Sequence, residues 1–110
     1  MADVAESFVR AVDGEVYGSV VDGVLGLLER PPGRKPPENL VHLSVWFRSM
    51  AEAEQQNVRR LVQLVAHQSV FGMLAALDGS RTLGSEVGVI VDGHDLTGRP
   101  LHELFQGMHA

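Results

Sequence analysis

The 110-residue chain contains no cysteine, so disulfide bonds and thiolate chemistry can contribute nothing to its fold or function. It also lacks an uninterrupted apolar run of about 18 residues, which is the length that a membrane-spanning helix needs. The first residues lack the basic start of a secretion signal. We therefore expect a cytoplasmic protein that does not enter a membrane.

Basic residues are also scarce, because nine Lys and Arg stand against 14 Asp and Glu and give a net charge of −5. Nucleic-acid binding needs a dense row of positive side chains, and the only basic region here is Arg34, Lys35 and Arg48. We expect this acidic protein to bind neither nucleic acid nor an anionic membrane surface. Only one of the nine basic residues is lysine, a usage typical of GC-rich bacterial genomes.

Motifs that carry chemistry are missing from the sequence. There is no Gly-x-Ser-x-Gly elbow, and no glycine-rich loop ends in Gly-Lys-Ser or Gly-Lys-Thr. No two histidines lie four residues apart, as a helical metal site would require. The sequence therefore predicts no catalytic residue, no metal site and no cofactor.

What the chain does contain is an ordinary apolar share of 45%, which predicts a single globular domain over residues 1–110. Its organising stretch is 49–79. Ser49 and Glu52 have the spacing of a capping box, no proline follows, and Gly79 suits a left-handed helix end. The second half of this long central helix is apolar on every side, so we expect neighbours to cover every side.

Residues 3–30 have helical apolar spacing but contain four glycines, which disfavour helix. Either this first helix breaks near 13–14, or its glycines face a closely packed neighbour. Small residues form a row on each long helix, and we predict that these rows pack together within the chain or across a dimer. The rows consist of Gly14 and Gly18 on the first helix, and of Ser69, Gly72 and Ala76 on the central helix.

Proline residues and an Asp-Gly pair predict where the remaining segments begin and end. Residues 31–37 form a proline-rich linker, and 38–48 a short second helix. Asp-Gly at 92–93 predicts a hairpin that pairs 87–91 with 94–97. A terminal helix follows Pro100, and we expect its Leu104 and Phe105 to pack in an apolar groove. The predicted fold class is mainly α, a small helical bundle around one long central helix, with a short C-terminal β-hairpin and a terminal helix.

His67 is the one residue on which two functional interpretations diverge. It shares a helical face with apolar residues, so it is either a buried neutral histidine or part of a ligand pocket lined by Tyr17 or Trp46. The first interpretation favours a small non-catalytic bacterial protein-interaction or regulatory adaptor domain that self-associates as a homodimer and has a possible further protein partner. The alternative is a small-molecule-binding domain or small enzyme with an internal pocket around His67.

Overall fold

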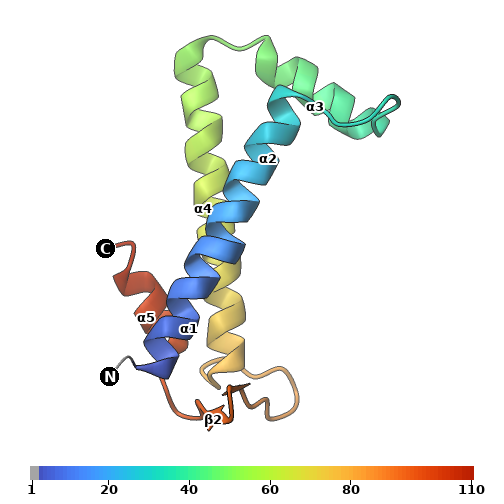
Figure 1. Ribbon diagram of the computed structural model, residues 1–110. Helices are drawn as coiled ribbons and strands as arrows, with labels where there is room; N and C mark the ends of the chain where they lie inside the picture. Colours follow the sequence, from blue (N-terminus) through green and yellow to red (C-terminus); the bar gives the residue numbers. More distant parts are fainter. Residues whose placement is uncertain (1–2) are drawn as a thin grey trace. The chain divides into compact units, whose positions relative to one another are not determined.

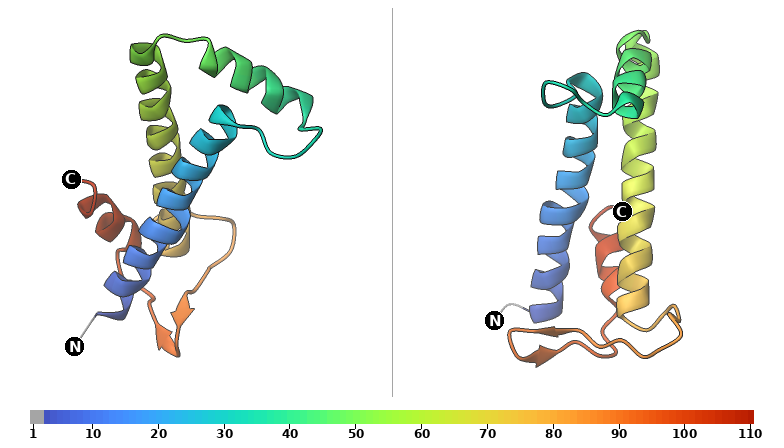
Figure 2. Two further views of the ribbon diagram at one scale, coloured as in Figure 1. Left: turned by 45° about the horizontal axis from the view of Figure 1, so that its top comes forward. Right: turned by 90° about the vertical axis from the view of Figure 1, so that its right-hand side faces the viewer.

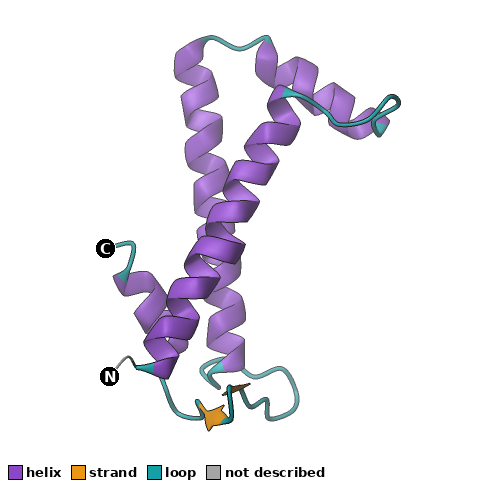
Figure 3. Ribbon diagram, viewed as in Figure 1, coloured by secondary structure: helices purple, strands orange, loops and turns teal. Residues whose placement is uncertain are grey.

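The computed structural model describes residues 3–110, and its fold is mainly helical (Figures 1 and 3). One long helix, a short antiparallel hairpin and a C-terminal helix are present, so the predicted fold class is confirmed. The elements in order are α1 (Val4–Val12), η1 (Asp13–Gly18), α2 (Ser19–Glu29), α3 (Glu38–Arg48), α4 (Glu52–Leu77), β1 (Ile90–Val91), β2 (His94–Asp95) and α5 (Leu101–Gly107).

The chain divides into two compact units, and the division passes through both long helical segments. Unit 1 comprises Met1–Tyr17 and His67–Ala110, and unit 2 comprises Gly18–Ala66. Unit 1 therefore joins the two ends of the sequence, whereas unit 2 is one continuous piece of chain.

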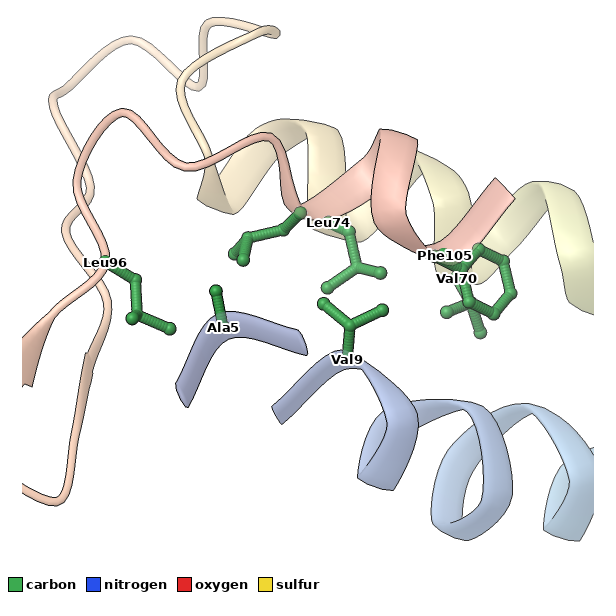
Figure 4. Close-up of a cluster of buried hydrophobic side chains, with 7 residues drawn as sticks. Ala5, Val9, Val70, Leu74, Leu96 and Phe105 are labelled. Carbon is green, nitrogen blue, oxygen red and sulfur yellow. The ribbon is translucent and has the colours of Figure 1, made fainter. Parts of the chain in front are cut away.

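Unit 1 has an apolar core between α1, the second half of α4 and α5 (Figure 4). On α5, Leu101 and Phe105 lie one turn apart and are both 0% exposed, so the terminal helix does fill an apolar groove. Leu104 packs at the edge of the same core. The buried members are Ala5, Val9, Val70, Leu74, Leu96, Leu101 and Phe105.

A polar contact joins the start of α1 to the segment that leads into α5. The Asp3 carboxylate caps α1 by accepting the backbone N–H of Ala5 at 3.1 Å. The same carboxylate accepts from both terminal nitrogens of Arg99, with Nη1 at 3.0 Å from Oδ1. This forked pairing fixes the geometry of both segments, because a guanidinium and a carboxylate match in shape.

The hairpin of unit 1 is shorter than predicted but has the expected turn. Ile90 pairs with Asp95 and Val91 with His94. Asp92 and Gly93 both have positive φ, 49° and 80°, as the two central positions of a type I′ turn require. In Figure 2 the hairpin lies across the ends of α1 and α4.

In unit 2, α3 packs against α2 around a fully buried serine. The Ser44 hydroxyl donates to the Leu28 carbonyl at 2.6 Å and accepts from Nε of Arg48 at 3.1 Å. The adjacent Phe47 is 1% exposed, and its carbonyl accepts from the side-chain amide of Gln55 at 3.0 Å. These bonds join α2, α3 and the start of α4.

The first helical segment does not break near residues 13–14. Asp13–Gly18 form a π-helical stretch, so helical backbone continues from Val4 to Glu29. An ideal Cβ placed on Gly14 has no atom within 4 Å among the described residues, so close packing there is not made within the chain. Packing of this glycine row across a dimer stays a prediction.

The capping box predicted at Ser49 is wrong. Ser49 ends α3 with helical backbone angles, φ −81° and ψ −9°, and its hydroxyl donates to the Trp46 carbonyl at 2.8 Å. The next helix begins at Glu52, where the Ala51 carbonyl accepts the first helical bonds. The backbone of Ser49 is still helical, so its hydroxyl lies near the carbonyl groups of the preceding turn and donates to one of them. The end of the helix was predicted correctly, because Gly79 has a φ of +86°.

Candidate functional site

Unit 2 leaves more large apolar side chains on its surface than it buries. Single exposed apolar residues are normal, but contiguous ones on helix faces are typical of interaction sites. Each of the following is at least 36% exposed, and together they are called the apolar surface of unit 2: Val20, Val24, Leu27, Val41, Leu43, Val45, Trp46, Leu61, Leu64 and Val65.

On α2 this surface combines valine and leucine with glycine. Val20, Gly23 and Leu27 lie three and four residues apart, so they share one helical face. Val20 is 46% exposed and Leu27 is 38% exposed. Gly23 and Gly26 are exposed too, and ideal Cβ atoms on them have nothing within 4 Å. The α2 face is therefore apolar and open to close approach.

On α4 the surface consists of large side chains. Leu61, Leu64 and Val65 share a face and are 56%, 55% and 57% exposed. Further along the helix, in unit 1, Met73 is 59% exposed. The prediction that the apolar second half of α4 is covered on every side is therefore wrong, because Met73 in that half is exposed.

By length and composition alone, α4 could cross a membrane. Its most apolar window has a mean hydropathy of 1.2, and 28% of that window is buried. A core helix of a soluble protein passes the same test, so this observation carries little weight. The expectation that the protein does not enter a membrane stays a prediction.

His67 lies in a group of aromatic rings in unit 1. Its ring stacks on Phe105 with centroids 4.9 Å apart, and the ring of His109 lies 5.0 Å away. Tyr17 meets His67 edge-on at 6.3 Å. Nε2 of His109 lies 2.6 Å from the carboxylate of Asp13. Since these rings lie against one another, the group holds the end of α5 to α4 and η1.

The predicted pocket residues belong to different units. Tyr17 lies beside His67, as one interpretation of the sequence expected, and no side-chain hydrogen bond joins His67 to a described residue. Trp46 lies on α3 in unit 2 and is 46% exposed, whereas the rings around His67 belong to unit 1.

The sequence did not predict a polar group in unit 1 that is separate from the rings around His67. It is formed by Asp78, Ser80 and His102. The carboxylate of Asp78 is bonded to Nδ1 of His102 and also accepts the backbone N–H of His102 at 3.2 Å. The Ser80 hydroxyl lies 3.5 Å from the same ring nitrogen. A nucleophilic triad needs the hydroxyl on one imidazole nitrogen and the carboxylate on the other, whereas here both lie on Nδ1, so this group does not have the geometry of such a triad.

Burial raises the pKa of Asp78, but hydrogen bonds from His102 and Ser80 outweigh that effect and lower it to about 2. Asp78 is therefore a carboxylate at neutral pH although its side chain is 1% exposed. The only signal in the sequence is Asp-Gly at the end of a helix, which does not indicate a partner 24 residues away.

A cavity of about 520 Å³ lies in unit 1, beside the loop that follows α4. Its polar lining includes Arg81, Thr82 and Ser85. The guanidinium of Arg81 lies 6.0 Å from the ring of Phe71, and its Nη1 would be 3.1 Å from a Cβ on Gly72. Within the chain, the gap at Gly72 is thus filled by Arg81. Ala76 is 8% exposed and lines the cavity, while Ser69 is exposed.

Among residues 3–110, no three histidines or carboxylates are arranged to hold a metal ion. No protein-family model matches the chain, and no curated protein or solved structure matches it either.

Proposed function

We propose that this chain is a small non-catalytic protein-interaction module that self-associates as a homodimer through unit 2. The observation that carries the proposal is the apolar surface of unit 2, defined above. Large side chains such as Leu61, Leu64 and Trp46 are half exposed on it. Burying such side chains against a partner removes apolar area from water, which is the main favourable term in association.

The distribution of charge supports a second copy of the chain as the partner that covers the apolar surface of unit 2. Within Gly18–Ala66, six Lys and Arg stand against five Asp and Glu, a net charge of +1. The rest of the chain has three Arg and nine Asp and Glu, a net charge of −6. Two copies that meet through unit 2 therefore bring together parts that are nearly neutral, which limits repulsion at the interface. A regulatory or adaptor role would use a further protein partner.

Sedimentation equilibrium tests the proposal directly. At micromolar concentration we expect a mass of twice the 11.9 kDa chain. The double substitution Leu61→Gln and Leu64→Gln should shift the protein to monomer. Leu83→Gln is the matched control, because Leu83 is also exposed, at 61%, but lies in unit 1.

Two results would overturn the homodimer. One is a clean monomer at high micromolar concentration. The other is wild-type protein that floats with neutral lipid vesicles and stays monomeric in water, which would identify the apolar surface as membrane-seeking.

The alternative proposal is small-molecule binding around His67. It is supported by the edge-on position of Tyr17 beside His67 and by the absence of a hydrogen-bond partner for the imidazole among the described residues. A thermal-shift screen of metabolites on the wild type and on His67→Leu separates the two proposals.

A further inference from the structure

The cavity of about 520 Å³ in unit 1 has a size suited to a small metabolite. Ala76 and Leu77, at the end of α4, line one part of it. The loop between α4 and β1 supplies most of the remaining lining, and Thr97 and Gly98 complete it (Figure 1). All of these residues belong to unit 1, so the cavity is formed without unit 2.

The loop that surrounds the cavity leaves its backbone donors unused. No backbone N–H of residues 82–88 donates to a described residue. Backbone N–H groups are strong donors, and most of those in a folded protein have a partner. Ideal Cβ atoms on Gly84 and Gly88 would have nothing within 4 Å, so the backbone is open to approach at these two points. The loop therefore offers free donors to a molecule that occupies the cavity.

Arg81 brings an unpaired positive charge to the cavity. Its backbone N–H donates to the Ala75 carbonyl at 3.0 Å, which fixes the residue to the end of α4. Its guanidinium lies 6.0 Å from the centre of the Phe71 ring, beside Gly72. No carboxylate among the described residues pairs with it. A guanidinium that is held in place without an ion-pair partner is well suited to bind a carboxylate.

Two carboxylates line the same cavity, and only one of them is free. Asp78 is 1% exposed and is bonded to His102 and Ser80, so its charge is already satisfied. Glu86 is exposed and has no hydrogen bond or ion pair with a described residue. It does not pair with Arg81, although both line the cavity. The cavity thus presents one free cation and one free anion that do not meet.

We infer that this cavity binds a free α-amino acid. The carboxylate of the ligand accepts from Arg81 and from the N–H groups of the loop, and its ammonium group donates to Glu86. A ligand that is only an anion would be repelled by Glu86, and one that is only a cation would be repelled by Arg81. A zwitterion matches both charges. The site is independent of the proposed self-association, which uses unit 2.

A nuclear magnetic resonance titration of the isotope-labelled full chain tests the site. Each of the common L-amino acids is added at millimolar concentration, and the backbone amide signals of residues 82–88 are followed. We expect an amino acid to shift these signals to saturation, because its carboxylate takes up the free N–H donors. Its amide, which lacks the carboxylate, and its N-acetyl derivative, which lacks the ammonium group, should each bind about tenfold more weakly.

Two variants test each end of the ligand separately. Arg81→Gln should weaken binding of the amino acid about tenfold and abolish its advantage over the amide, while the advantage over the N-acetyl derivative remains. Glu86→Gln should have the reverse effect. Arg10→Gln and Glu103→Gln are matched controls, because both residues are exposed in unit 1 and neither lines the cavity. Neither control should change the affinity, and circular dichroism melting of every variant checks that the fold is kept.

Three results would overturn the inference. The first is the absence of a saturable shift at residues 82–88 with every amino acid. The second is equal binding of the amino acid and its N-acetyl derivative, which would identify a site for anions alone. The third is an affinity that stays unchanged in both Arg81→Gln and Glu86→Gln, which would place the ligand elsewhere. None of these results bears on the homodimer, which is tested through substitutions in unit 2.

Discussion

The carboxylate of Asp78, just after α4, accepts the backbone N–H of His102 in the first turn of α5 at 3.2 Å. It also binds the ring of His102 and the backbone N–H of Ser80, the latter at 3.0 Å. One buried side chain thus satisfies an N–H at the start of α5 and fixes where that helix begins relative to α4. Since α5 supplies Leu101 and Phe105 to the core of unit 1, this contact positions a large part of that core.

The lowered pKa of Asp78 predicts a pH dependence of stability. A carboxyl group whose pKa is lower in the folded protein stabilises the fold above its unfolded value of 3.8, and this contribution is lost as the pH falls toward 2. The shift corresponds to at most about 2 kcal/mol of unfolding free energy. We expect Asp78→Asn to be less stable than the wild type at pH 7, and the difference to shrink between pH 4 and 2.

Chemical denaturation across that range measures the difference. The pKa of Asp3 and that of Asp95 are also lowered, chiefly by hydrogen bonds from Arg99 and Thr97 respectively. Both groups titrate in wild type and variant alike, so their effects cancel in the comparison. A stability difference that stays constant from pH 7 to pH 2 would contradict the role given to Asp78.

Substitutions of exposed and buried leucines of α4 should differ in how much stability they cost. Leu74 is 2% exposed in the core of unit 1, so Leu74→Ala should cost about 2–5 kcal/mol of unfolding free energy. Leu64 is 55% exposed, so Leu64→Gln should change the stability of the monomer by no more than about 0.5 kcal/mol. Urea unfolding of dilute protein measures both. A large loss for Leu64→Gln under dilute conditions would mean that this leucine is covered within the chain.

Substitution of Gly72 tests which part of the chain lies beside its α carbon. In a helix interior, Gly72→Ala should gain up to about 1 kcal/mol from helix propensity. The new Cβ would meet only Nη1 of Arg81, at 3.1 Å, and the end of an exposed arginine can move away. We therefore expect a higher melting temperature, and the gain should be larger when Arg81→Ala is introduced in the background. A drop in both backgrounds would indicate that backbone, not arginine, lies against this glycine.

His67 separates the two functional proposals. No hydrogen bond to a described residue is lost in His67→Leu, and the leucine can still pack on Phe105. We expect the fold to be kept, with a change in stability below about 1.5 kcal/mol. A thermal-shift screen of metabolites and divalent metals on both proteins should yield no stabilisation that depends on His67. A compound that raises the melting temperature of the wild type by several degrees, and not that of the variant, would favour the small-molecule site.

Local patterns in the sequence predicted most of the elements correctly. Apolar residues at helical spacing indicated α3, α4 and α5, and Asp92-Gly93 indicated the hairpin, because these signals act over a few residues. The start of α4 was misplaced, since the hydroxyl of Ser49 has the right chemistry for either neighbouring helix. Only the backbone angles at that position decide between them.

Features that join distant parts of the chain could not be predicted. Asp78 meets His102 across 24 residues, and Asp13 meets His109 across 96. No local periodicity encodes such pairs, so the candidate site around His67 was predicted only as far as Tyr17. The apolar half of α4 was expected to be covered on all sides, and Met73 shows that the described chain alone does not supply enough surface to do so.

The division of the chain also has a consequence for the order in which it folds during synthesis. Unit 2 is continuous from Gly18 to Ala66, so all its contacts become available once that stretch has left the ribosome. Unit 1 packs α1 against α5. Asp3 can pair with Arg99 only after the 96 residues up to Arg99 have been synthesised. Contacts at such separation form slowly because a long loop must close first. The apolar surface of unit 2 is therefore present on nascent chains before the core of unit 1 can form, and neighbouring chains on one messenger could meet through it while still being made.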